Sequence, residues 1–176
     1  GTPLPDNIDV LHGFNLGRPA DLLSYFTSFP GKKVLSSIYV DYALADSIRF
    51  PFLYKVLGKH GLEHMKTLAR AVNGSDRWPG LAYALRGQRR SVQALLKHTH
   101  TVLTSSDSEA RRLEQDFGAL PKTITVPLGV AEKFLSPPKE GPKEGVLMLG
   151  RLEWLKNQKT VIQWATKHQW PLTVVG

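Results

Sequence analysis

Short apolar segments alternate along the chain with longer segments that have helical periodicity. The apolar segments predict strands, and the first four of them cover 8–14, 33–40, 101–104 and 123–127. Apolar residues at helical spacing predict intervening helices over 19–29, 49–72 and 81–98. Ser106 and Glu109 form a capping box that predicts another helix, with Gly118 at its C-cap. This alternation is typical of an α/β fold with parallel sheets.

The pattern is interrupted at 136–145, which contains three Pro, two Gly and no other apolar side chain. Such a composition predicts a linker. Beyond it a strand at 146–149, a helix at 157–168 and a strand at 172–175 are expected. We therefore predict one α/β domain over 1–135 and the start of a second over 146–176. The second unit is too short to bury a core alone, so we expect both domains to be incomplete in this chain.

Composition excludes several classes of protein. The 176 residues are 41% hydrophobic and 22% charged, which excludes wholesale disorder. The chain has no Cys, which excludes a disulfide scaffold and a thiolate metal site. His60, His64, His98 and His100 have no carboxylates at metal-ligand spacing, so no metal site is predicted. Without an apolar run of membrane-spanning length or a signal-peptide pattern, we expect a cytoplasmic protein.

Positive charge is concentrated in the predicted helices between 49 and 100. The whole chain has a net charge of +8, and this segment contains ten Lys or Arg and only two acids, Glu63 and Asp76. A basic helical insert of this kind attracts an anionic partner, which could be nucleic acid, acidic lipid or a phosphorylated substrate. The alternative is a solvated basic helix pair with no partner.

The segment 146–158 predicts an anion site. A strand leads into Gly150, whose lack of a side chain permits a tight turn and close approach of a ligand. Arg151 follows at the carboxyl end of that strand, and Lys156 lies just before Asn157, the expected helix cap. Two cations and a helix N-terminus together favour a diphosphate. The alternative is that both are ordinary surface charges, and neither a dinucleotide fingerprint nor a P-loop is present.

Several segments together resemble one enzyme family. They are L-G-R-L-E-W-L-K-N-Q (149–158), I-D-V-L-H (8–12), V-L-T-S-S-D-S-E (102–109), I-T-V-P-L-G-V (124–130) and S-S-I-Y-V-D-Y (36–42). Along the chain, these segments resemble motifs of the bacterial retaining glycosyltransferases of family 4, and they occur in the same order as in that family, which has the GT-B fold. Each segment is weak alone, and the ordered set spans nearly the whole chain.

The resemblance implies two Rossmann-like domains and a hexosyltransferase of cell-surface polysaccharide biosynthesis. The donor would be a nucleoside-diphosphate-sugar, and the acceptor a glycan or a lipid-linked molecule. By position, Gly150, Arg151 and Lys156 would bind the donor diphosphate without a metal ion or another cofactor. Enzymes of this kind often work at the cytoplasmic face of the membrane, so peripheral contact with anionic lipid is expected.

The chain also departs from the family pattern. Leu128, Ala131 and Val40 stand where the family has Asn, Asp and His. The family's glycine-rich loop and its E-x7-E motif would lie before Gly1 and after Gly176. We expect this chain to be inactive by itself, and a catalytically dead GT-B-like partner subunit is an alternative.

For several other candidate residues the sequence allows two interpretations. Asp41 is either a sugar-binding or catalytic carboxylate or a turn residue after its strand. Arg86, Arg89 and Arg90 are candidates for a pyrophosphate-linked acceptor or a membrane, and the apolar residues of 50–56 fit an interfacial helix. A nucleic-acid-binding module is the remaining alternative, although the cations are not interleaved with exposed aromatics.

Three aromatic residues complete the predictions from sequence. His12 is expected to be a buried, hydrogen-bonded imidazole. Trp164 lies at helical spacing and is predicted to be part of the core, whereas Trp154, between Arg151 and Lys156, is the better candidate for stacking on a ligand.

Overall fold

The structure is a computed structural model that describes residues 3–5, 7–132, 135 and 144–176. It divides into two compact units, Gly1–Gly129 and Val130–Gly176, and each is described by itself. Most of the predicted linker, 136–143, lies outside the described residues.

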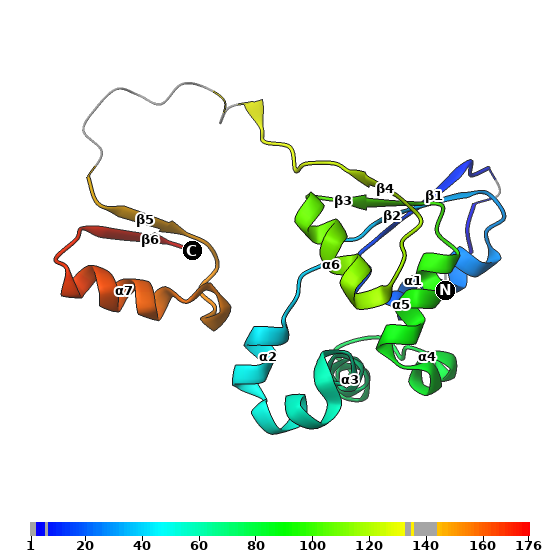
Figure 1. Cartoon of the computed structure of the whole chain (residues 1–176), viewed down its shortest axis with the longest axis horizontal. Coiled ribbons are helices and arrows are strands. Elements are labelled where there is room, and N and C mark those ends of the chain that lie inside the picture. Colours follow the sequence, from blue (N-terminus) through cyan, green and yellow to red (C-terminus); the bar gives the residue numbers. More distant parts are fainter. Residues whose placement is uncertain (1–2, 6, 133–134, 136–143) are drawn as a thin grey trace. The chain divides into compact units, whose positions relative to one another are not determined.

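The first unit is built on a four-stranded parallel sheet in the order β1-β2-β3-β4 (Figure 1). The strands are β1 (Val10–Phe14), β2 (Lys32–Ser36), β3 (Thr101–Thr104) and β4 (Lys122–Thr125). The helices of this unit are α1 (Pro19–Ser28), α2 (Ala43–Arg49), α3 (Pro51–Val72), α4 (Leu81–Arg86), α5 (Gln88–Lys97) and α6 (Asp107–Phe117). The predicted α/β architecture with parallel strands is therefore confirmed.

The core lies between the helices and one face of the sheet. Leu35 of β2 pairs in register with Val102 of β3, and both are fully buried. Side chains of α1, α5 and α6 complete the cluster, among them Phe26. Gly13 of β1 permits this packing, because a Cβ built on it would lie 2.7 Å from the Phe26 ring. Figure 1 shows the helices of this unit gathered on one side of the sheet.

The other face of this sheet is open in the part of the chain that the structure describes. Val10 and Phe14 of β1 are 49% and 57% exposed, and Ile124 of β4 is 41% exposed. His12 lies on the same face, exposed rather than buried as predicted, and its Nε2 is 2.9 Å from the Ser36 hydroxyl.

The two long predicted helices are present but interrupted. The segment 49–72 corresponds to α3, which begins at Pro51 because Phe50 before it lies outside the helical region (φ −133°, ψ 58°), and which bends at Gly58 (φ 63°, ψ −179°). Helix α2, before it, was not predicted. The segment 81–98 is broken at Gly87, which has a φ of 79°. Strand β2 ends at Ser36 rather than Val40, since Ile38 has a φ of 43°.

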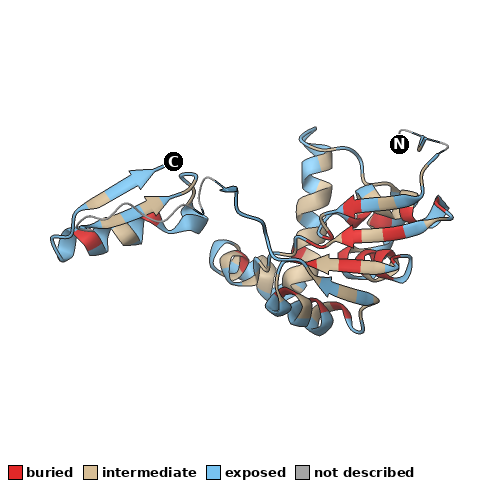
Figure 2. Cartoon of the chain, turned by 90° about the horizontal axis from the view of Figure 1, so that it is seen from above, coloured by how far each residue is buried: buried red, intermediate tan, exposed pale blue. Residues whose placement is uncertain are grey.

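The second unit is a parallel pair, β5 (Val146–Leu149) and β6 (Leu172–Val175), joined through the 3₁₀ helix η2 (Trp154–Lys156) and the α-helix α7 (Gln158–Lys167). Figure 2 shows that most of this unit is exposed. The prediction that Trp164 is a core residue is wrong, because it is 49% exposed and packs edge-on against Trp170, with ring centroids 4.7 Å apart. None of the described helices has the length and apolarity that crossing a membrane requires.

Candidate functional site

A cavity of about 220 Å³ opens at the carboxyl ends of β1 and β2. Its walls come from the segments that follow these strands and from α2, α3, α5 and α6. The polar side chains that line it are those of Asn15, Tyr39, Asp41, Tyr42, Asp46, Lys59, His60, Glu63 and Gln88. This is the edge at which parallel α/β sheets bind ligands. The volume is below the roughly 300–1,000 Å³ of drug-sized pockets, so the cavity fits a small polar group.

Asp41 lines this cavity and is held from two sides. Its Oδ1 accepts a hydrogen bond from the backbone N–H of Ala43 at 2.9 Å, which is the turn interaction that the sequence offered as one interpretation. Its Oδ2 lies 3.4 Å from a guanidinium nitrogen of Arg112. The carboxylate is thus fixed at the cavity wall.

The segment after β2 is held in place by Glu109 of α6. Its Oε1 accepts from the Ser37 hydroxyl at 2.6 Å and from the Tyr39 backbone N–H at 2.7 Å. Its Oε2 accepts from both the N–H and the hydroxyl of Ser105 at 2.7 Å. Burial alone would raise the pKa of Glu109, but these hydrogen bonds outweigh it and lower the pKa below its ordinary value. The predicted capping box is present at its Ser106 end, whose hydroxyl accepts from the Glu109 N–H at 3.2 Å.

Asp116, near the end of α6, joins three elements beside the cavity. Its carboxylate accepts hydrogen bonds from the Tyr39 hydroxyl and the Lys59 ammonium. Burial, reinforced by the bond to Asp116, raises the pKa of Tyr39 above its ordinary value. Although burial opposes it, the bonds from Lys59 and Tyr39 lower the pKa of Asp116. At neutral pH this cluster therefore holds Asp116 as a carboxylate and Tyr39 as an un-ionised phenol.

His60 lies next to Lys59 and lines the same cavity. Its ring packs on Phe117, with centroids 5.3 Å apart. Burial, and then the charge of Lys59, lower the pKa of His60 below its ordinary value. His60 is therefore neutral at physiological pH and has a ring nitrogen that can accept a proton or a hydrogen bond.

Asp46 and Glu63 share one cation. The Lys66 ammonium lies 2.6 Å from both carboxylate oxygens of Asp46 and 2.8 Å from an oxygen of Glu63. Burial opposes the charged form of Lys66, yet these bonds raise its pKa above its ordinary value. The triad fastens α2 to α3 at this wall of the cavity.

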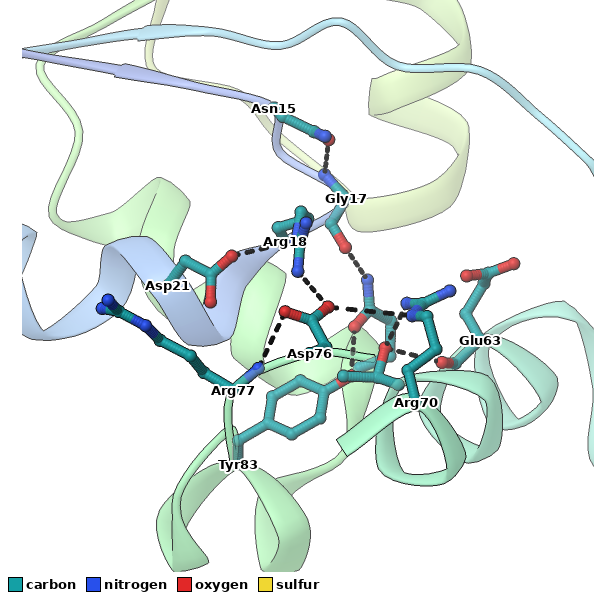
Figure 3. Close-up of polar contacts among 11 residues, drawn as sticks. Asn15, Gly17, Arg18, Asp21, Glu63, Arg70, Asp76, Arg77 and Tyr83 are labelled. Carbon is teal, nitrogen blue, oxygen red and sulfur yellow. Dashed lines mark hydrogen bonds and ion pairs between the residues drawn. The ribbon is translucent and has the colours of Figure 1, made fainter. Parts of the chain in front are cut away.

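A second polar cluster connects the turn after β1 to the loop after α3 (Figure 3). Asp76, in the loop after α3, accepts from Arg18 and from the Arg77 backbone N–H, and lies 3.9 Å from Arg70. Next to it the Tyr83 hydroxyl donates to Gln88 at 2.6 Å, and the Gln88 amide donates to the Gly17 carbonyl at 2.9 Å. These bonds link the turn after β1 to α3, α4 and α5.

The structure separates the three arginines that the sequence grouped. Arg89 donates to the backbone carbonyl of Asp116 at 3.1 Å. Arg86 and Arg90 instead line an open groove of about 780 Å³ along α5, together with Lys97. None of the described residues lining this groove is acidic. The groove is thus a cationic surface next to the loop between α6 and β4.

In the second unit, Gly150 follows β5 with a φ of 146°, and its N–H donates to the Val175 carbonyl at 2.9 Å. Arg151 comes next; its side chain is 88% exposed and lies 3.0 Å from Glu153. Lys156 ends η2, exposed, and Asn157 precedes α7 in the left-handed region, at a φ of 56°, without a side-chain capping bond. Both cations thus belong to the turn between β5 and α7.

Sequence reasoning missed Lys59, His60, Asp46 and Tyr39 as cavity residues. Lys59 and His60 directly follow the non-helical Gly58 in α3, and no motif indicated that they lie beside Tyr39 and Asp46. Within the described ranges no group of three or more His, Cys, Asp or Glu could hold a metal ion.

Comparisons with protein-family models, with curated proteins and with solved structures each found no match.

Proposed function

We propose that this protein is a retaining glycosyltransferase with a GT-B arrangement, which transfers a sugar from a nucleoside-diphosphate donor to a glycan or lipid-linked acceptor. The observation that carries the proposal is the turn after β5. There Gly150 leads from a parallel strand into an exposed Arg151, and Lys156 lies just before the N-terminus of α7. The resemblance of 149–158 to the family's donor segment agrees with it.

In this proposal Arg151 and Lys156 bind the donor diphosphate. The bond between the anomeric carbon and the diphosphate breaks, an acceptor hydroxyl oxygen bonds to that carbon, and the hydroxyl proton passes to a leaving-group oxygen. Negative charge grows on the diphosphate during this step, and two cations with the backbone N–H groups of a helix N-terminus stabilise it. No metal ion or other cofactor is required by this scheme.

The cavity of the first unit is assigned to the acceptor. Asp41 is a fixed carboxylate that can accept a hydrogen bond from a sugar hydroxyl. A ring nitrogen of neutral His60 can accept a second hydrogen bond from the sugar. Arg86 and Arg90 in the groove along α5 would bind the phosphate groups of a pyrophosphate-linked acceptor. Arg89, which bonds to Asp116, would help to position α6 instead.

The test is calorimetric titration with UDP, GDP and ADP of the protein expressed from its complete reading frame. We expect one diphosphate to bind, and Arg151→Ala to weaken it by about 1.5–3 kcal/mol, the contribution of a hydrogen bond to a charged group. Lys167→Ala, which removes one cation at the other end of α7, is the matched control and should bind normally.

Folded protein that binds none of the three diphosphates would contradict the proposal. Equal affinity of the Arg151→Ala and Lys167→Ala variants would remove Arg151 from the donor site. If a diphosphate binds but the protein releases no nucleotide from any nucleotide-sugar, the result would favour the alternative that it is a catalytically dead GT-B-like partner subunit.

A further inference from the structure

Helix α2 and the first two turns of α3 expose an unusual amount of apolar surface. Leu44 and Phe52 are each 75% exposed, and Ile48 and Val56 are each 65% exposed. Contiguous exposed apolar surface of this kind marks a site of interaction with a protein or a membrane. We call this surface the apolar corner, defined by these four residues.

The four side chains lie on two consecutive helices. Leu44 and Ile48 are four residues apart in α2, and Phe52 and Val56 are four residues apart in α3, so each pair shares a helix face. The two helices follow each other directly, since Phe50 donates to the Asp46 carbonyl and Tyr54 to the Phe50 carbonyl, both at 2.8 Å. Figure 1 shows the chain turning from α2 directly into the start of α3.

The charge around the apolar corner is positive. Arg49 and Lys55 are exposed among the apolar residues. The sequence between Tyr42 and Leu62 contains a single acid, Asp46, and this carboxylate is turned inward, 6% exposed and bound by Lys66. The outward face therefore presents apolar and cationic groups and no carboxylate from this segment.

We propose that the apolar corner docks on an anionic phospholipid bilayer, with its apolar side chains in the interface and its cations at the headgroups. An amphipathic helix with Phe, Leu and Ile on one side and flanking Lys or Arg lies in the plane of such an interface. The negative surface of the bilayer attracts the flanking cations. The two cationic side chains thus match the anionic headgroups of the bilayer, and the four apolar side chains match its apolar interior.

Gly58 separates this surface from the candidate site. It has a φ of 63° and a ψ of −179° inside α3, and the residues directly after it, Lys59 and His60, line the cavity. One kinked helix therefore carries both the docking surface and part of the cavity wall. That this brings a lipid-linked acceptor to the cavity rests on the proposed transferase function, whereas the docking itself does not.

The test is co-sedimentation with vesicles of phosphatidylcholine, with and without about 30% phosphatidylglycerol. We expect binding at least about tenfold stronger to the anionic vesicles, and a loss of at least about tenfold in Ile48→Asp/Phe52→Asp. The control is Val72→Asp/Leu128→Asp, which makes the same change of charge at residues that are 76% and 84% exposed. The control should bind within about threefold of the unchanged protein.

A second measurement uses the absence of Cys from the sequence. Ile48→Cys and Val72→Cys each provide a unique site for an environment-sensitive fluorophore, with little effect on folding because both side chains are exposed. On anionic vesicles the probe at 48 should shift to the blue and the probe at 72 should not.

Three results would overturn the docking proposal. They are equal vesicle binding by the corner and control variants, equal spectral shifts at 48 and 72, and no vesicle binding by the unchanged protein. In the last case, a change of oligomeric state in Ile48→Asp/Phe52→Asp would assign the apolar corner to a second copy of the chain. Diphosphate binding by the same variants is measured separately, so failure of the docking proposal is distinguishable from failure of the transferase proposal.

Discussion

Glu109 shows how one residue can serve local and long-range structure together. At sequence level it is the fourth member of a capping box, and Ser106 does cap α6. Its carboxylate, however, accepts hydrogen bonds from Ser37, Tyr39 and Ser105, so it fixes the cavity wall as well as the helix. The local role could be predicted from spacing, whereas the contacts to Ser37 and Tyr39 depend on the pairing of β2 with β3.

We expect Glu109→Gln to lower the free energy of unfolding by roughly 1–3 kcal/mol near neutral pH, because donors that now face a carboxylate would meet an amide. The lowered pKa of Glu109 means that its contribution is complete above the ordinary value of about 4.3 and is lost as the pH falls through the folded-state value. The difference between the two proteins should therefore shrink from about pH 7 to about pH 3 in urea titrations. Glu114→Gln, at an exposed position of α6, is the control, and a difference that grows on acidification would contradict the assignment.

At the scale of elements, apolar spacing predicted the positions of the strands and helices well and their breaks poorly. Strands β3, β5 and β6 have the predicted bounds, since each is a short apolar run between turn residues. Helix periodicity continues through Gly58 and Gly87, where positive φ angles interrupt the helices. The cavity residues of α3 were missed for the same reason, because a periodic pattern does not say where a helix bends.

Gly58 allows a test of the bend in α3. Its φ of 63° and ψ of −179° belong to a region that is essentially restricted to glycine. Gly58→Ala should therefore lower the free energy of unfolding by about 1–3 kcal/mol in denaturant titrations. Gly129→Ala is the control, because a Cβ there meets nothing within 4 Å and no positive φ is involved. Equal stability of the two variants would mean that α3 does not need this bend.

At the scale of the whole molecule, the two units differ in how much they bury. The nine buried residues of the main core cluster all lie between Leu16 and Phe117, within the first unit. In the second unit, Leu147 and Leu149 of β5 remain 61% and 68% exposed. The candidate donor residues and the candidate acceptor cavity are thus on units with very different cores.

We expect residues 1–129 alone to unfold cooperatively, with a midpoint within about 5 °C of the main transition of the whole chain, because the core cluster is retained. The same fragment should keep its binding to anionic vesicles and lose binding to nucleoside diphosphates. Circular dichroism during heating checks the cooperative unfolding, and calorimetry checks the loss of diphosphate binding. A non-cooperative melt of the fragment would show that the first unit needs residues beyond Gly129.

The bond between Glu109 and Ser37 also has a consequence for the order of folding. These residues are 72 positions apart, and β2 cannot pair with β3 until the intervening helices have been synthesised. During translation the helices α2 to α5 therefore emerge before the strand and the carboxylate that anchor them exist. Long-range pairings of this kind form slowly, because the loop entropy is lost before the contact is gained. On the ribosome the residues of the apolar corner are thus synthesised, and open to chaperones or to a lipid surface, before the cavity has its final wall.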